Sequence, residues 1–184
     1  MAQSNTSEAI TTSLVAPASI YVRAYAEIKI TTLPDCLDLM PTQGHASDIG
    51  YDLKSRKELV LDPTKTLVVP TGVRIYLAPN RYDTEGALPT FVMEAQVRSR
   101  SGLAAKSGVM VLNSPGTIDP DYTGEIQVIL YNAGPKPLAI QRGDRIAQLV
   151  FNLVPEIKFQ YLSNLDFDRI ITVRGAGGFG STGN

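Results

Sequence analysis

The stretch Gly143-Asp-Arg-Ile-Ala-Gln-Leu-Val-Phe151 alternates between two sets of side chains along its length. A period of two residues is typical of a β-strand, because successive side chains point to opposite faces of the sheet. The predicted faces are Arg145, Ala147 and Leu149 on one side, and Ile146, Gln148 and Val150 on the other. We therefore expect a strand over residues 145–153.

Six further short runs, rich in β-branched residues, are separated by turn-forming residues along the chain. They cover residues 20–30, 65–69, 72–77, 91–97, 125–131 and 137–140. The 12 prolines, spread from Pro17 to Pro155, would interrupt any long helix. This pattern predicts an all-β domain, either a sandwich or a compact barrel. One short helix is expected over Ser101–Ser107, where helix-forming residues follow a serine.

The composition excludes several classes of protein. A chain of 184 residues fits a single domain, and its 17 basic and 18 acidic residues give no positive field for a nucleic-acid backbone. One cysteine and one histidine build neither a disulfide framework nor a Cys/His zinc site. No basic residue precedes Arg23, as a secretory signal would need, and no apolar run approaches the ~20 residues of a membrane span. We expect a cytoplasmic protein, in a bacterial, phage or viral host cytosol, that binds neither nucleic acid nor membrane.

Three stretches look peripheral to the core. Residues 1–19 are rich in Ser, Thr and Ala and predict a loose extension, and residues 79–90 predict a long surface loop. Residues 174–184 hold five of the 15 glycines and predict a flexible arm. The predicted domain therefore spans residues 20–173.

Two stretches carry phosphate-binding features. In Arg98-Ser-Arg-Ser-Gly-Leu-Ala-Ala-Lys106, a Ser-Gly pair enters the predicted helix behind a planar guanidinium suited to phosphate oxygens. An ordinary helix cap with solvated arginines is the alternative. The glycines of the tail let backbone amides approach a ligand, beside the hydroxyls of Ser181 and Thr182. A plain linker is the alternative there, although it has little use for Phe179.

A third stretch, Asn113-Ser-Pro-Gly-Thr-Ile-Asp-Pro-Asp-Tyr-Thr-Gly-Glu-Ile-Gln127, predicts a hairpin from its turn residues. Asp119 is either a turn former or, near a phosphate site, a carboxylate that orients a water molecule. The segment Ala46–Leu53 fits a tight entry into a strand through Gly50 and Asp52.

Together and in this order, five segments resemble the five motifs of the trimeric deoxyuridine triphosphatase (dUTPase) family. They are ASDIGYDL, RSGLAAKSG, NSPGTIDPDYTGE, GDRIAQL and RGAGGFGSTG, and they span about Ala46–Gly183. The resemblance implies a distorted, jelly-roll-like β-barrel of the β-clip type. It also implies a homotrimer that hydrolyses dUTP to dUMP and pyrophosphate, with each active site built from three chains.

The same resemblance implies roles for single residues. Those assigned to the uracil and the deoxyribose are Asn113, Thr117, Ile118, Gln127 and Tyr122. Those assigned to the phosphates are Arg100, Ser101, Gly102 and Gln148, and those assigned to a C-terminal lid are Arg174, Phe179, Gly180, Ser181 and Thr182. The catalytic residues would be Asp119, which orients the water, together with Gln148 and Arg100. Asp52 and Arg145 would form a supporting ion pair.

Mg²⁺ is the implied cofactor, held by the triphosphate and water without a direct protein ligand. Two features depart from the family pattern. Ser99 stands where the family often has proline, and the loop over residues 79–90 is longer than the usual turn.

Two other functions fit parts of the sequence. A dCTP deaminase would share the fold and the Ile-Asp-Pro hairpin, but its catalytic glutamate would fall at Ile129, which cannot transfer protons. A regulatory protein of the same fold would bind a protein partner through residues 79–90.

Overall fold

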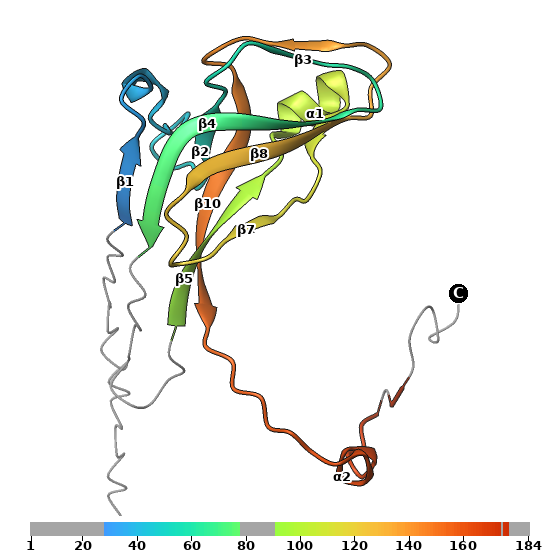
Figure 1. The fold of residues 1–184 in the computed structure, drawn as a ribbon. Helices are drawn as coiled ribbons and strands as arrows, with labels where there is room; N and C mark the ends of the chain where they lie inside the picture. The colour runs from blue at the N-terminus through green and yellow to red at the C-terminus, as the bar shows by residue number, and fades with distance from the viewer. Residues whose placement is uncertain (1–27, 78–90, 174, 177–184) are drawn as a thin grey trace, which may run out of the picture.

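The computed structural model describes residues 28–77, 91–173 and 175–176, and its strands form antiparallel sheets (Figure 1). In spatial order, the first sheet contains β1 (Ile28–Thr32), β4 (Thr66–Leu77), β8 (Glu125–Asn132) and β6 (Val109–Val111). The second contains β2 (Tyr51–Lys54), β10 (Arg145–Pro155), β5 (Phe91–Arg98) and β7 (Gly116–Ile118). A small third sheet pairs β3 (Leu59–Leu61) with β9 (Leu138–Ile140). The all-β expectation is confirmed, although the described strands leave the sheets open and do not close a barrel.

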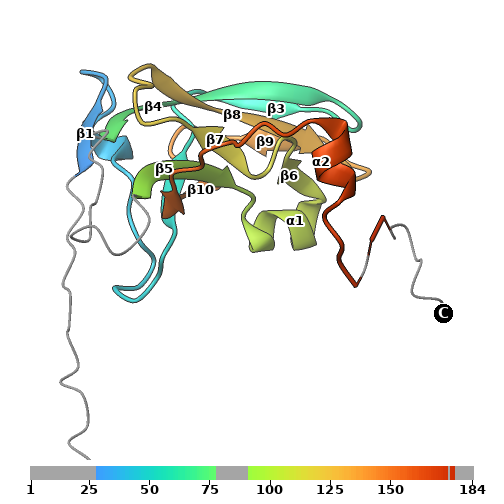
Figure 2. The ribbon, with the colours of Figure 1, turned by 90° about the horizontal axis from the view of Figure 1, so that it is seen from below.

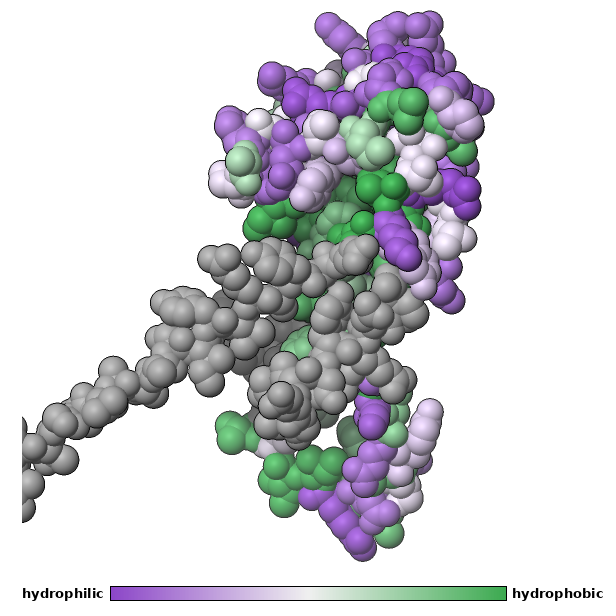
Figure 3. All heavy atoms as spheres, turned by 90° about the vertical axis from the view of Figure 1, so that its left-hand side faces the viewer, coloured by the Kyte–Doolittle hydropathy of each residue, from purple (hydrophilic) through white to green (hydrophobic). Residues whose placement is uncertain are grey.

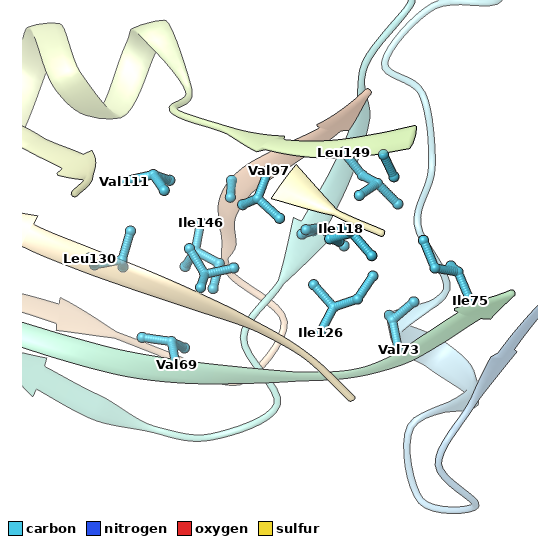
Figure 4. Close-up of a cluster of buried hydrophobic side chains, with 14 of the residues drawn as sticks. Val69, Val73, Ile75, Val97, Val111, Ile118, Ile126, Leu130, Ile146 and Leu149 are labelled. Atoms are coloured by element: carbon cyan, nitrogen blue, oxygen red, sulfur yellow. The ribbon is translucent and has the colours of Figure 1, made fainter. Parts of the chain in front are cut away.

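The hydrophobic core lies between the two four-stranded sheets, whose inner side chains point toward one another (Figure 4). On β8, Ile126, Val128 and Leu130 are at most 2% exposed, while the residues between them face outward. This alternation is the reason that β8 folds as predicted. Each fully buried aliphatic side chain contributes about 1.5–3 kcal/mol of transfer free energy to folding.

The predicted faces of β10 are wrong at one end of the strand. The register between β10 and β2 pairs Arg145 with Lys54 and Ala147 with Leu53, so Ile146 is one residue too many. Such a β-bulge bends the strand and breaks the period of two residues. Ile146 and Ala147 are therefore both buried in the core with Leu149, whereas the alternation had placed Ile146 on the opposite face.

Other elements agree with the predictions in part. The helix α1 has the predicted bounds, Ser101–Ser107, and β5, β8, β9 and β10 correspond to predicted runs. The runs over residues 65–69 and 72–77 form a single strand, β4, which continues through Gly72 at a φ of +74°. A side chain at Gly72 would collide with the buried Cys36, whose Sγ lies 2.6 Å from the position of an added Cβ.

The sequence analysis missed two short helices and three short strands. The 3₁₀ helix η1 covers Leu37–Leu39 and the helix α2 covers Asn164–Asp168. The Ser163 hydroxyl caps α2 by accepting the Asp166 N–H at 3.1 Å. The missed strands β3, β6 and β7 have three residues each, too few to show a periodic pattern.

An exposed ion pair fixes η1 against the turn before β10. Both terminal nitrogens of Arg142 bond to the carboxylate of Asp38, and Arg142 also donates to the Asp35 carbonyl at 2.8 Å. The hydrogen bond from Arg142 holds the pKa of Asp38 below its usual value. Because the folded-state pKa is lowered, this pair stabilises the fold above the unfolded pKa and loses its effect as the pH falls.

Beyond β10 the chain runs away from the sheets to α2, which lies apart from them (Figures 1 and 2). Large hydrophobic side chains along this segment, residues 156–173, are exposed, and Figure 3 shows hydrophobic residues gathered at this lower end. They are Ile157, Phe159, Tyr161, Leu162, Leu165, Phe167, Ile170, Ile171 and Val173. We call residues 156–173 the C-terminal segment.

Among the described residues, no helix is long and apolar enough to cross a membrane. The predicted extension over residues 1–19 lies outside the described residues, as do the loop over 79–90 and the tail residues Arg174, Phe179, Gly180, Ser181 and Thr182.

Candidate active site

A cavity of about 420 Å³ opens beside the hairpin between β7 and β8. Six residues that the sequence analysis had assigned to the base, the sugar and the water line it together. They are Asn113, Thr117, Ile118, Asp119, Tyr122 and Gln127. The sequence analysis missed its apolar wall, which includes Val68 from β4 and Ile129 from β8. A cavity of this size and mixed lining is typical of a small-molecule site.

The strand β7 gives the cavity a rigid floor. It pairs with β5 through Thr117 opposite Gln96 and Ile118 opposite Ala95. The Ile118 side chain is buried in the core, so this residue presents mainly its backbone to the cavity. Asp119 follows directly and is exposed, which leaves its carboxylate accessible to a ligand.

Tyr122 is held over the hairpin by its own turn. Its N–H bonds to the Asp119 carbonyl at 3.1 Å, and its hydroxyl donates to the Glu125 carbonyl at 2.9 Å. The ring lies so close to Gly124 that an added Cβ would be 2.5 Å from the hydroxyl oxygen. Gly124 is therefore needed for this ring position, a role that turn chemistry alone did not reveal.

Asn113 lies on the turn that connects β6 to β7. The adjacent Leu112 N–H bonds to the Ile129 carbonyl of β8 at 2.8 Å, which fixes the start of the turn. The Asn113 amide packs against Gly116, where an added Cβ would lie 3.1 Å from its nitrogen. These contacts place a side-chain amide, which both donates and accepts hydrogen bonds, at the cavity wall.

A second cluster joins three of the predicted residues around a buried carboxylate. Asp52 is 5% exposed and contacts Arg100 Nε at 3.0 Å and an Arg145 terminal nitrogen at 3.1 Å. Arg100 also donates to the Arg145 carbonyl at 2.9 Å. The structure therefore contains the predicted Asp52–Arg145 ion pair and adds Arg100 to it, so that its guanidinium is fixed in one orientation.

The start of α1 lies beside this cluster. The Arg100 carbonyl accepts the N–H groups of Leu103 and Ala104 at 3.1 and 3.0 Å, which begins the helix at Ser101. A helix leaves its first N–H groups without intrahelical partners. At Gly102, an added Cβ would meet no described atom within 4 Å, so open space surrounds this glycine.

Gln148 lies on β10 between β2 and β5. It pairs with Asp52 on one side and Arg98 on the other, and its side-chain amide packs 3.2 Å from the position of a Cβ added at Gly50. The backbone thus places Gln148 next to the carboxylate that orients Arg100. Gly50, which makes room for the amide, had fitted a tight strand entry in the sequence analysis.

The phosphate-binding candidates and the base-binding candidates line different cavities of the same chain. Arg100 and Arg145 line a cavity of about 230 Å³ that shares no described lining residue with the cavity of Asp119. Among the described residues, no group of three His, Cys, Asp or Glu side chains is arranged to hold a metal ion.

Comparisons with known proteins agree on one family. The dUTPase family model matches residues 39–183. A deoxyuridine 5′-triphosphate nucleotidohydrolase of Gloeothece citriformis is 40% identical over 157 residues, covering 85% of this chain and 97% of that protein. Another, from Wolbachia pipientis, is 43% identical over 146 residues, covering 78% of this chain and 86% of that protein.

A solved structure with a similar fold is the dUTPase of Staphylococcus bacteriophage 80alpha with dUpNHpp. It has a TM-score of 0.66 and 25% identity, and the match covers 86% of this chain and 99% of that chain. The jelly-roll-like expectation is confirmed by this likeness. With its five motifs in order and its family match over most of its length, the chain belongs to the dUTPase family.

Proposed function

We propose that the protein hydrolyses dUTP to dUMP and pyrophosphate, with the nucleoside in the cavity of the β7–β8 hairpin. The observation that carries this proposal is that the six residues assigned to the base, sugar and water line one cavity. The curated relatives named for this activity support it. Release of pyrophosphate from dUTP by the purified protein tests it.

The base is recognised by hydrogen bonds from fixed groups in this proposal. The Asn113 amide and the backbone of Thr117 and Ile118 offer both donors and acceptors, so that they match uracil and leave unpaired groups against cytosine. An unpaired buried group costs ~1–3 kcal/mol. Tyr122 packs against the deoxyribose and leaves no room for a 2′-hydroxyl, while Gln127 lies nearby.

The reaction is an in-line attack of water on the α-phosphorus. Asp119 accepts a hydrogen bond from the water and orients it, and its negative charge favours removal of the proton. Arg100, fixed by Asp52, meets the charge that builds on the leaving pyrophosphate. Ser101, Gly102 and Gln148 bind the phosphates, and the open space at Gly102 admits close approach of an oxygen atom.

Mg²⁺ fits this arrangement through oxygen chemistry. The ion prefers oxygen ligands and keeps several waters, so the triphosphate and waters hold it in this proposal. The Asp119 carboxylate and the Gln148 amide oxygen are acceptors suited to those waters. When bound, the ion neutralises charge on the pyrophosphate. The tail residues Arg174, Phe179, Gly180, Ser181 and Thr182 then cover the substrate as a lid.

Deamination of dCTP is not favoured. The position where a deaminase of this fold would need its glutamate holds Ile129, which lines the cavity. An isoleucine side chain neither gives nor takes a proton.

A homotrimer would bring the two groups of site residues together. In one chain, Arg100 and Asp119 line separate cavities, whereas a site shared between chains unites them. The C-terminal segment also carries nine exposed large hydrophobic side chains, and exposed apolar patches of this kind mark protein contacts. Both features support a closed trimer.

The assembly can be measured directly. Sedimentation equilibrium is expected to give three times the 19.9 kDa mass of one chain. Aspartate in place of both Phe159 and Ile171, which are 80% and 95% exposed, should reduce the trimer and its activity together. Val60→Asp, on the exposed face of β3, is the matched control and should leave both unchanged. A fully active monomer would contradict the shared site.

Tyr122 is expected to determine rejection of UTP. Tyr122→Ala opens space beneath the sugar, so the ratio of kcat/KM for dUTP over UTP should fall at least about tenfold. Gly124→Ala should lower the same ratio, because its methyl group displaces the Tyr122 ring. Tyr76→Ala, on β4, removes the same ring away from the cavity and serves as the control. An unchanged ratio in Tyr122→Ala would show that another residue selects the sugar.

A further inference from the structure

Ser99 lies between β5 and α1, directly before Arg100, and is half-buried. Its hydroxyl oxygen accepts the backbone N–H of Val111 at 2.9 Å. Val111 is the last residue of β6, which ends the strand order of its sheet, and it is 3% exposed. The next N–H, of Leu112, bonds to Ile129 of β8. Successive N–H groups of a strand point to opposite sides, so the Val111 N–H faces the open edge and Ser99 supplies its acceptor.

This hydrogen bond connects the two turns that bind substrate in the proposed function. On one side, Ser99 precedes the Arg100–Gly102 turn, whose Arg100 carbonyl begins α1. On the other side, the Val111 carbonyl accepts the Ser114 N–H at 3.2 Å, which closes the turn that carries Asn113. The peptide groups on either side of Val111 thus bond to both turns.

We propose that Ser99 is a positioning residue that keeps the Arg100–Gly102 turn and the Asn113 turn in register for substrate binding. The proposal rests on the proposed function, because these turns would bind the phosphates and the base. Removing the hydroxyl leaves a buried N–H without its acceptor, so the two turns are free to shift against each other.

The groups that act in the chemical step are held independently of Ser99. Asp119 follows β7, which is fixed by its pairing with β5. The Arg100 guanidinium is fixed by Asp52 and by the Arg145 carbonyl. Loss of the Ser99 hydroxyl should therefore weaken binding of dUTP much more than it slows the bound substrate.

The test uses Ser99→Ala and Ser99→Thr in the full chain. We expect Ser99→Ala to raise KM for dUTP about five- to tenfold with kcat within about twofold of wild type. Ser99→Thr keeps the hydroxyl oxygen and should restore KM. Amide hydrogen exchange at Val111 should become faster in Ser99→Ala and return to the wild-type rate in Ser99→Thr.

Ser55→Ala provides a control that is matched in burial. Ser55 is fully buried, and its hydroxyl donates to the Lys57 carbonyl at 2.7 Å and accepts the Lys57 N–H at 3.3 Å, in neither cavity. It should lower the melting temperature without changing KM. The proposal is overturned if KM is unchanged in Ser99→Ala, if Ser55→Ala raises it equally, or if exchange at Val111 does not change. A wild-type protein inactive on dUTP would refute the proposed function instead, and exchange at Val111 would still decide the hydrogen bond.

Discussion

Replacement of Asp119 by asparagine is expected to lower kcat for dUTP by at least about 10²-fold. Asparagine keeps the size and hydrogen bonding of the side chain but lacks the negative charge that activates water. The residue is exposed at the cavity and makes few demands on folding, so the melting temperature should stay close to that of the wild type. Steady-state pyrophosphate release measures kcat, and equilibrium binding of dUTP should be retained.

Asp121→Asn gives the matched control for this prediction. Asp121 lies two residues further along the same hairpin, is also exposed, and does not line the cavity. Its replacement should leave kcat within about twofold of the wild type, as is usual for a surface change away from the reacting atoms. Wild-type turnover in Asp119→Asn, or an equal loss in both variants, would rule out Asp119 as the residue that activates the water.

Asp52→Asn is expected to reduce kcat/KM for dUTP by about 10- to 10²-fold, through Arg100 rather than through contact with substrate. The carboxylate is almost fully buried between two guanidinium groups, so the neutral amide leaves them facing each other. Arg100 then loses its fixed orientation. Breaking a buried ion pair costs about 3–5 kcal/mol, and the half-exposed Arg145 reduces this loss through solvent screening.

Two further variants identify which arginine matters. Asp62→Asn, in the exposed turn after β3, removes a carboxylate remote from the cluster and should leave activity and stability unchanged. Arg145→Met should cost less activity than Asp52→Asn, because Arg100 keeps its bond to the carboxylate. If Arg145→Met were as damaging as Asp52→Asn, the effect of Asp52 would pass through Arg145 instead.

The residues of the nucleoside cavity were predictable because they lie close together in the sequence. The turn residues between Asn113 and Gln127 predict a hairpin, and a hairpin brings its own side chains together without help from the rest of the fold. The strand β8 was equally clear, since its alternation is uninterrupted from Ile126 to Leu130. Local chemistry and tertiary packing favour the same structure at these positions.

The arrangement around Asp52 could be predicted only in part. The family resemblance paired Asp52 with Arg145, but the contact of both with Arg100 depends on the order β2–β10–β5, which joins residues about fifty positions apart. The bulge at Ile146 was not predictable either, because an extra residue in a strand leaves the composition of the strand unchanged. The roles of Gly124 and Ser99 likewise depend on contacts that a sequence does not specify.

Pyrophosphate release from dUTP, dCTP, dTTP and UTP, measured side by side with the same protein, tests the central claim most directly. We predict kcat/KM for dUTP at least about 10²-fold above that for each other nucleotide, because the cavity pairs with uracil and excludes both a 5-methyl and a 2′-hydroxyl group. Ammonia release from dCTP should be absent. Comparable kcat/KM for UTP or dCTP, or ammonia released from dCTP, would contradict the account.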